Sequence, residues 1–394
     1  MMEKFEDKVR ITGIGLSRVG RRLGGDPRAL AAEACLAALR DAGLERRDID
    51  GLSSHPGPLS MDGYSGAGIG DIEELLRFQP IWFNSGHEMP GHSGALVQAA
   101  LALAAGLCRH VLVFRATWES TAQALRRADG AVAAGGAVEG DELWRVPFGA
   151  FSPANWISLY AMRHFHRYGT TREQLGAIAL NARANACLNP SAVYRTPLSM
   201  EDYLGARMVS SPFGLYDCDV PCDGAVALVL SRADAARDTR RHNPLRIEAL
   251  GTATCERWSW DQSTLEHEPL IRGACDSLWR RTDLKPADVD VAQLYDGFTF
   301  NALCWLELLG FCPEGEGGRF VEGGRRIALD GELPMNTGGG QLSGGRLQGF
   351  GLLHEACLQL WGEAGQRQVA GAPEVAVVST GGGAPGGTVL LTAS

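Results

Sequence analysis

Side chains that can move protons or hydrogen-bond a reacting oxygen occur in several short segments, two of which also contain glycine runs. The candidate catalytic side chains are Tyr295, Asp296, Arg346, His92 and Ser379. The glycine runs span residues 338–340 and 381–383. Glycine lets a backbone approach a ligand closely and present N–H groups to a developing oxyanion, although tight turns are its commonest use. These segments predict acid–base chemistry beside a site that stabilises negative oxygen.

One segment is similar to the active-site segment of a known family. It reads Tyr295-Asp-Gly-Phe-Thr-Phe-Asn-Ala-Leu-Cys304 and is followed by Leu-Gly-Phe-Cys-Pro-Glu-Gly. It resembles the lipid-transfer-type thiolases, in which this segment usually begins His-Asp-Cys-Phe. Two further stretches resemble thiolase signatures, namely Asn336-Thr-Gly-Gly-Gly-Gln-Leu-Ser-Gly-Gly-Arg346 and Val378-Ser379-Thr-Gly-Gly-Gly383. The resemblance to the superfamily covers nearly the whole chain.

The residues that differ from the family pattern are those that carry thiolase chemistry. The helix-start segment Pro90-Gly91-His92-Ser93 places Gly91 where the resemblance implies the nucleophilic cysteine. Arg346 stands in place of the activating histidine, and Ser379 in place of the second cysteine. A thiolate at a helix N-terminus is what such a cysteine would supply. The resemblance therefore implies that covalent acyl transfer through the family's own cysteine positions cannot occur, whereas the surrounding glycines remain.

A β-hydroxyacyl thioester can be cleaved without a nucleophile. A base removes the hydroxyl proton, the carbon–carbon bond breaks, and the thioester enolate is reprotonated. The chain is most similar to the cysteine-less, thiolase-like aldolases of steroid side-chain degradation, which implies this retro-aldol reaction on a β-hydroxyacyl-CoA and proton transfer by Tyr295. We expect Arg346 to lower the pKa of that phenol. A second tyrosine of those aldolases is missing from residues 343–348.

Several side chains also have structural interpretations. Tyr295 could be a packed core aromatic, and Asp296 is expected to cap a helix that starts at Gly297. His92 could face solvent at a helix start, and Ser379 could be a turn serine. The predicted substrate-binding residues are Gly339, Gly340, Gln341, Asn336, Gly382, Gly383 and Gln348. Asn336 and Gln341 are candidates to hold a catalytic water or the substrate hydroxyl.

An internal repeat determines the expected fold. Residues 38–52 and 278–292 share a helix end, a turn with Asp-x-Asp and an apolar strand, at an offset of 240 residues. Residues 223–231 and 386–394 are a second similar pair. Each half begins with an apolar strand, at 9–15 and 245–251, and alternates strands with helices, which indicates a mixed sheet covered on both faces. We predict an α/β thiolase fold with two pseudo-repeated αβαβα layered halves.

The expected domain boundaries follow from the repeat. The N-terminal half is assigned to residues 1–240 and the C-terminal half to 241–394, with the boundary in the polar stretch 231–244. More than a hundred residues lie between the strand at 111–114 and the closing strand near Gly224, too many for one simple connection. Helical patterns at 154–168 and 172–187 predict an inserted loop domain over about 116–222, which in thiolases covers the acyl-CoA tunnel.

Composition restricts the partners and the compartment. A net charge of -9 argues against nucleic-acid binding, and charges or glycines interrupt every apolar run before it reaches a membrane-spanning length. The ten cysteines are scattered, and Cys218 and Cys222 lack further ligands for zinc, so we predict no metal and a reducing, cytoplasmic location. Gly-x-Gly pieces lack the nucleotide-binding spacing. The expected ligand is a coenzyme A thioester acting as substrate, with no cofactor.

The resemblance also implies an assembly, and two rival functions stay open. We expect a homodimer and a small OB-fold, zinc-ribbon partner protein that completes a heterotetramer. One rival is an acyltransferase or thiolase with an unusual nucleophile such as Ser93 or Cys304. The other is a non-catalytic subunit that binds acyl-CoA or lipid. An acyl-protein adduct would favour the first rival, and ligand binding without turnover would favour the second.

Overall fold

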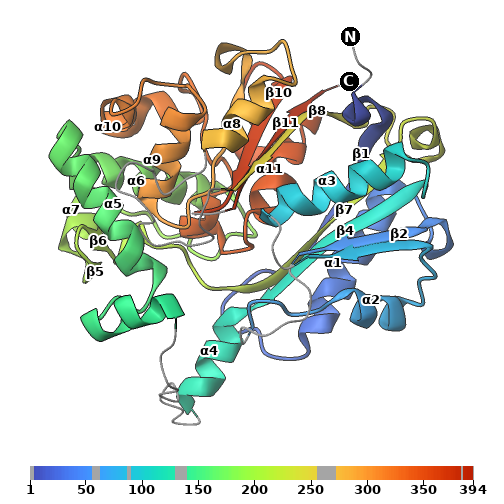
Figure 1. Cartoon of the computed structure of the whole chain (residues 1–394), viewed down its shortest axis with the longest axis horizontal. Helices are drawn as coiled ribbons and strands as arrows, with labels where there is room; N and C mark the ends of the chain where they lie inside the picture. The colour runs from blue at the N-terminus through green and yellow to red at the C-terminus, as the bar shows by residue number, and fades with distance from the viewer. Residues whose placement is uncertain are drawn as a thin grey trace.

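The computed structural model describes residues 4–55, 63–86, 90–128, 140–254, 272–382 and 385–393. Within these ranges, nine strands form one mixed sheet in the order β3-β2-β4-β7-β1-β8-β11-β10-β9 (Figure 1). The strands are β1 (Val9–Leu16), β2 (Gly51–Ser54), β3 (Trp82–Ser85), β4 (His110–Trp118), β7 (Asp223–Arg232), β8 (Leu245–Ala253), β9 (Val291–Gln293), β10 (Val375–Thr380) and β11 (Gly386–Thr392).

The sheet repeats its own pattern on either side of its centre. In the N-terminal half β1 is antiparallel to β7, β7 is antiparallel to β4, and β4 is parallel to β2. The C-terminal half has the same relations among β8, β11, β10 and β9. The halves meet where β1 pairs with β8 at Arg10–Arg246 and Ile11–Leu245. The repeat predicted from the sequence is therefore confirmed, and both segments of each predicted pair occupy equivalent strands.

Helices cover both faces of the sheet. They are α1 (Pro27–Ala42), α2 (Ile69–Leu76), α3 (Gly91–Ala104), α8 (Arg272–Trp279), α9 (Thr299–Leu308), α10 (Gly317–Val321) and α11 (Phe350–Trp361). Alternate side chains of β4 separate two cores: Val111 and Val113 belong to the cluster that includes α3, whereas Leu112 and Phe114 belong to the cluster of α1. This period of two is what a strand buried on both faces requires. Helix α3 contacts strands of both halves and also α11, so these two helices form the shared layer.

An insertion between β4 and β7 packs against the C-terminal half. It contains α4 (Glu119–Ala128), α5 (Pro153–Tyr168), α6 (Arg172–Leu188), α7 (Met200–Gly205) and the short strands β5 (Met208–Ser210) and β6 (Phe213–Gly214). The predicted helices at 154–168 and 172–187 are confirmed within one residue. In Figure 1 the green α5, α6 and α7 lie beside the orange α9 and α10, and α6 contacts both α9 and α10. The exact domain limits stay a prediction.

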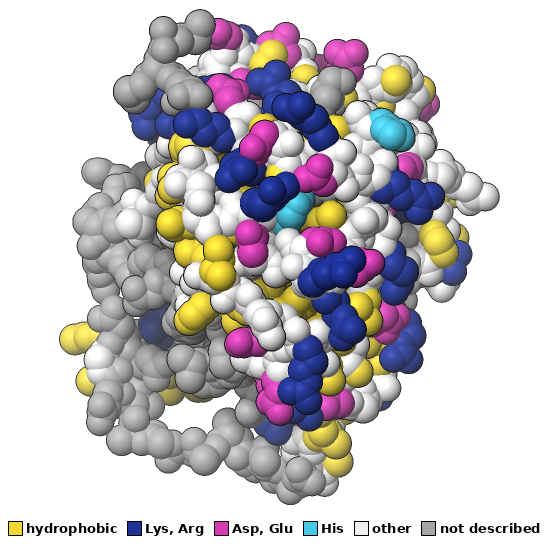
Figure 2. Space-filling view, turned by 90° about the vertical axis from the view of Figure 1, so that its right-hand side faces the viewer, with side chains coloured by type: hydrophobic (Ala, Val, Ile, Leu, Met, Phe, Trp, Pro, Cys, Tyr) yellow, Lys and Arg dark blue, Asp and Glu magenta, His cyan; other side chains and the backbone are white. Residues whose placement is uncertain are grey.

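The remaining surface features concern partners. None of the helices in the described ranges combines the length and apolar character needed to cross a bilayer. Over the face viewed in Figure 2, Lys and Arg side chains are interspersed with Asp and Glu, so that face has no continuous field of one sign. In the same described part of the chain, no group of three or more His, Cys, Asp or Glu side chains is placed to hold a metal.

Candidate active site

The segment after β9 is tied to the glycine-rich loop by side-chain hydrogen bonds. Asn336 accepts the Leu294 N–H at 2.7 Å and donates to the Leu294 carbonyl at 2.9 Å. Asp296 accepts the Gln341 N–H at 2.8 Å and the Leu342 N–H at 3.4 Å. Because Asn336 uses both its oxygen and its nitrogen on this backbone, it acts as a clamp between the two segments, and its assignment to substrate binding stays a prediction.

The expected capping role of Asp296 is wrong. Helix α9 begins at Thr299 with Phe298 as its N-cap residue, so Asp296 lies outside the helix. Its carboxylate instead accepts N–H groups of the loop, and hydrogen bonds to an ionised carboxylate are stronger than those between neutral groups. Burial raises the pKa of Asp296 to about 7, and these N–H donors act in the opposite direction. Asp296 therefore fixes the loop beside the candidate catalytic tyrosine.

The glycine-rich loop contains the predicted substrate-binding residues Asn336, Gly339, Gly340 and Gln341. Gly339 and Gly340 have φ angles of 98° and 57°, and the single π-helical turn Gly340–Gly344 (η9) follows. The Gln341 oxygen accepts the Gly349 N–H at 2.9 Å. The Gln341 amide nitrogen is buried, and the Gln341 side chain lies close enough to the Tyr295 hydroxyl to lower the pKa of that phenol. Gln341 therefore faces Tyr295 from the glycine-rich loop.

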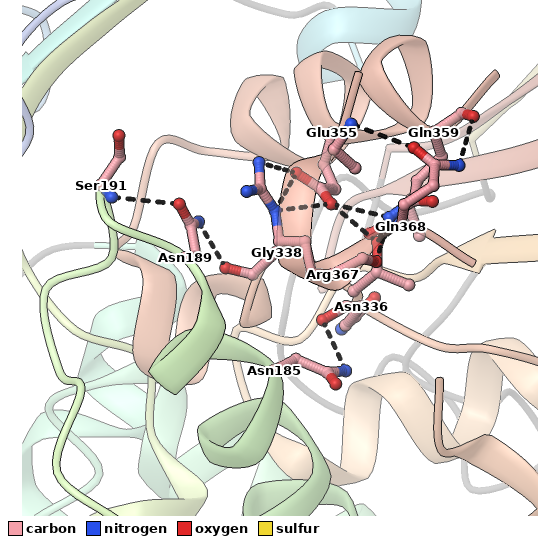
Figure 3. Close-up of polar contacts among 12 residues, drawn as sticks. Asn185, Asn189, Ser191, Asn336, Gly338, Glu355, Gln359, Arg367 and Gln368 are labelled. Carbon is pink, nitrogen blue, oxygen red and sulfur yellow. Dashed lines mark hydrogen bonds and ion pairs between the residues drawn. The ribbon is translucent and has the colours of Figure 1, made fainter. Parts of the chain in front are cut away.

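A buried polar network supports the far side of this loop (Figure 3). Asn189 donates to the Gly338 carbonyl at 2.8 Å. The Glu355 and Arg367 side chains form a buried ion pair, with Nη2 and Oε2 2.9 Å apart. Glu355 also accepts the hydroxyl hydrogen of Thr337 at 2.9 Å, next to the glycines. A small cavity of about 140 Å³ adjoins the network and is lined in part by Gln341, Glu355 and Arg367.

Replacing Arg367 with alanine is expected to lower the free energy of unfolding by about 3 kcal/mol. The reason is that Glu355 would then be a buried carboxylate without its cation. The measurement is chemical denaturation of the variant and the wild type under the same conditions. Arg319→Ala is the control, because Arg319 pairs with Glu316 on the surface with 76% and 44% of their side chains exposed. Equal stability of both variants would contradict the prediction.

The nucleophile position holds a glycine in a conformation that disfavours other residues. Gly91 is the first residue of α3 and has a φ of 53°. A Cβ atom there would lie 2.6 Å from the Thr380 hydroxyl oxygen. Thr380 thus fills the space beside the start of α3 that a side chain at residue 91 would need.

His92 is buried rather than exposed, so the solvent-facing alternative is wrong. Its Nε2 lies 3.3 Å from the Ser379 carbonyl oxygen, and its Nδ1 lies 3.3 Å from the Ser93 hydroxyl. Burial lowers the pKa of His92 to about 4, so its imidazole is neutral near pH 7. The Ser379 hydroxyl accepts the Tyr295 N–H at 2.9 Å. Ser379 is therefore a residue that positions Tyr295 at the end of β9.

The Tyr295 side chain lies at the meeting point of these segments. Its hydroxyl oxygen is 3.3 Å from the position that a Cβ atom on Gly297 would occupy. A carbon of its ring is 3.4 Å from the position that a Cβ atom on Gly382 would occupy. Gly382 thus lies against the tyrosine as predicted for a site residue, whereas Gly383 is outside the described residues. The phenol is 7% exposed. Tyr295 is therefore a buried phenol with glycine on two sides.

The expectation that Arg346 lowers the pKa of Tyr295 is wrong in its net effect. Burial raises that pKa above its usual range, the negative charge of Asp219 raises it further, and Arg346 acts in the opposite direction without prevailing. Arg346 is itself balanced by two carboxylates, Glu119 at 2.7 Å and Asp219 at 3.0 Å. Tyr295 is therefore a neutral phenol near pH 7, which can give a proton but does not take one.

Several groups near Tyr295 were not predicted from the sequence. Asp219 belongs to the Cys218–Cys222 stretch, in which the two cysteines suggested only half a zinc site. The acidic residues of this stretch were the sequence signal that could have identified Asp219. Tyr64 lies close enough to Tyr295 to raise its pKa. Its hydroxyl donates to Gln348 at 3.4 Å, and the Arg115 guanidinium carbon lies 4.6 Å from the Tyr64 ring centre. Gln348 is thus beside a second phenol, although residues 343–348 contain no tyrosine.

The two alternative nucleophiles are buried in packed elements. The Ser93 side chain is fully buried on α3, 2.6 Å from where a Cβ on Gly387 of β11 would stand. Cys304 lies within α9 in the main core cluster. Neither side chain is placed to attack a thioester. The geometry instead combines neutral Tyr295, an anchored glycine-rich loop and carboxylates around Arg346.

Comparisons with known proteins agree with this geometry. Residues 260–391 match the family described as thiolase C-terminal domain-like. The chain is 35% identical over 88% of both chains to the steroid side-chain-cleaving aldolase of Thermomonospora curvata. It is 34% identical to the 17-hydroxy-3-oxo-4-pregnene-20-carboxyl-CoA lyase of Mycobacterium tuberculosis, over 97% of this chain and 98% of that one. A solved Ltp2-ChsH2(DUF35) aldolase superposes with a TM-score of 0.85 at 30% identity over 98% of each chain. The chain therefore belongs to the thiolase superfamily, in its group of carbon–carbon lyases.

Proposed function

We propose that this lyase cleaves a steroid-derived β-hydroxyacyl-CoA to a ketone and a shorter acyl-CoA. The names of the two relatives, a steroid side-chain-cleaving aldolase and a pregnene-carboxyl-CoA lyase, support a steroid substrate. The observation that carries the proposal is the neutral Tyr295 phenol beside a glycine-rich loop anchored by Asp296. Retro-aldol cleavage redistributes protons and electron pairs within the substrate without adding or removing electrons, so its balance requires no redox cofactor.

Two segments of the described chain carry out different parts of this reaction. In this proposal the N–H groups of the glycine-rich loop and the Gln341 side chain hydrogen-bond the thioester oxygen, on which negative charge grows as the enolate forms. Tyr295 supplies the proton that the α-carbon receives after the bond breaks. Ser379 and Asn336 hold the tyrosine segment, through the Tyr295 and Leu294 backbones, in register with that loop.

We also propose a homodimer that joins a small OB-fold partner protein in a heterotetramer, in the cytoplasm. The solved relative is an Ltp2-ChsH2(DUF35) aldolase, and its DUF35 component supports such a partner. Strand β3 is one of the two edge strands of the sheet within the described residues, and Ile81, just before it, and Phe83, within it, are 74% and 68% exposed. Such an edge is suited to pairing with a second copy. Nine cysteines in the described ranges are unbridged, which fits a reducing compartment.

The test is expression of the chain together with a DUF35 protein from the same source, followed by product analysis. The purified complex is given a panel of β-hydroxyacyl-CoAs that includes steroid C17-hydroxy and simple aliphatic members. A ketone and a shorter acyl-CoA from the steroid members are expected, detected by mass spectrometry. Acyl-CoA binding without turnover would support the non-catalytic rival, and a stable acyl-protein adduct would support the acyltransferase rival.

A further inference from the structure

The neutral state of Tyr295 leaves one proton transfer unassigned. Retro-aldol cleavage removes a proton from the β-hydroxyl and delivers one to the α-carbon. Tyr295 can perform the delivery, but as a protonated phenol it cannot perform the removal. His92 is buried next to Ser379 and Asp296 is occupied by the N–H groups of Gln341 and Leu342. A different base must take the hydroxyl proton if the proposed function is correct.

Asp219 and the Tyr295 hydroxyl both lie against Gly297. The Asp219 backbone N–H donates to the Gly297 carbonyl at 3.1 Å, and Gly297 is the residue over which the Tyr295 hydroxyl lies. The Asp219 side chain is 8% exposed, and its Oδ1 is 3.0 Å from Nη1 of Arg346. The structure thus holds a buried carboxylate, paired with a guanidinium, on the segment that contacts Gly297 near the Tyr295 phenol.

The charges around Asp219 suit a base that works near neutral pH. Burial raises the pKa of Asp219 to about 7, and the negative charges of Glu119 and Asp296 act in the same direction. Arg346 acts in the opposite direction and keeps the group from being a permanently protonated acid. The negative charge of Asp219 also raises the pKa of Tyr295, which fits the position of both residues against Gly297.

We propose that Asp219 is the catalytic base of this lyase, a role that rests on the proposed function. Its carboxylate takes the β-hydroxyl proton, and the oxygen electrons form the ketone C=O as the Cα–Cβ bond breaks. The electrons of that bond form the thioester enolate, which takes the phenolic proton of Tyr295 at its α-carbon. Asp219 then passes its proton to the Tyr295 phenolate. Both side chains return to their starting states, and no other reactant is consumed.

The chain provides a matched control for this role. Glu119 contacts the same guanidinium at 2.7 Å with 9% of its side chain exposed, much as Asp219 does at 3.0 Å with 8%. Asp219→Asn and Glu119→Gln therefore each remove one negative charge from the same ion-pair cluster. In the complex with its partner protein, D219N is expected to lower kcat by about a thousandfold. E119Q is expected to lower it by less than tenfold, with a similar Tm for both variants.

The pH profile distinguishes a base from a positioning residue. A base must be unprotonated, so wild-type kcat/KM is expected to fall as the pH drops through about 7, the pKa to which burial raises Asp219. D219N is expected to lack this fall. Asp219→Glu retains a carboxylate and is expected to keep the fall and to exceed D219N in kcat by at least tenfold. If D219N folds poorly, the pH profile of Asp219→Glu still tests whether Asp219 is the base.

Several outcomes would overturn the assignment. Equal losses in D219N and E119Q would show that Asp219 acts only through the Arg346 ion pairs. A fall in activity near pH 7 that persists in D219N would point to Asp296 as the titrating group. If wild type cleaves substrate and D219N does so equally well, only the role of Asp219 is lost. If the wild-type complex cleaves no member of the panel, the proposed function fails together with it.

Discussion

Replacing Tyr295 with phenylalanine is expected to lower kcat by about a thousandfold while acyl-CoA binding persists. The variant keeps the ring that packs against Gly297 and Gly382, and it keeps the backbone N–H that Ser379 accepts. Only the hydroxyl is lost, and with it the proton for the enolate carbon. Binding is measured by calorimetry with a CoA thioester and turnover by ketone release. The substitution is expected to lower kcat and to leave KM unchanged, because the phenol acts in the transition state.

Tyr203→Phe is the matched control for this change. Tyr203 is another fully buried phenol, and its hydroxyl donates to Asp217, which also accepts the Thr299 hydroxyl hydrogen. Its removal is expected to lower stability by about 1 kcal/mol with kcat nearly unchanged. An active Tyr295→Phe complex would remove Tyr295 from the mechanism. Equal losses of kcat in both variants would show that a buried hydroxyl in this region matters only for structure.

Gly340→Ala is expected to abolish turnover and to lower the free energy of unfolding by about 4 kcal/mol. The φ of Gly340 is 57°, and a Cβ there would lie 1.9 Å from an Asp296 carboxylate oxygen. The alanine variant must therefore strain the backbone and also separate Asp296 from the Gln341 N–H. Loss of that contact moves the loop away from Tyr295. Thermal unfolding and turnover of the complex are the two measurements.

Gly344→Ala tests whether this effect is specific to Gly340. Gly344 ends the same π-helical turn, lacks a positive φ, and would place its Cβ no closer than 3.3 Å to a neighbouring atom, the Gly338 carbonyl oxygen. It is expected to retain most of the stability and turnover. Comparable damage from both alanines would mean that the effect is not specific to the Asp296 contact at Gly340. Full activity of Gly340→Ala would mean that the Asp296 contact is dispensable.

The large-scale fold could be predicted because repetition is visible along the chain. Asp48 and Asp288 precede equivalent strands, β2 and β9, and the closing strands β7 and β11 also share a pattern. Periodicity and turn residues depend on near neighbours in the sequence, so they can be identified without coordinates. The resemblance of the signature segments then brought Tyr295, Gly340 and Ser379 into one site, and the structure places their segments side by side.

The electrostatics of the site could not be predicted in the same way. Arg346 was expected to act on Tyr295, but its charge is shared with Glu119 and Asp219, which come from distant segments. No local pattern shows that these carboxylates converge on one guanidinium. The Asp296 cap failed for a similar reason, because loop N–H groups from residues 341 and 342 compete with the nearby helix start. Burial of His92 likewise depends on its contact with Ser379 across the fold.

The tight fit at Gly91 constrains how new chemistry could be introduced here. A thiol at residue 91 needs both an unfavourable backbone angle and the volume that the Thr380 hydroxyl now fills. Trimming Thr380 to a smaller residue would remove only the steric barrier, and the backbone angle would still strain any side chain at residue 91. An engineer who wants to introduce acyl transfer would therefore have to remodel the start of this helix as well as its neighbour.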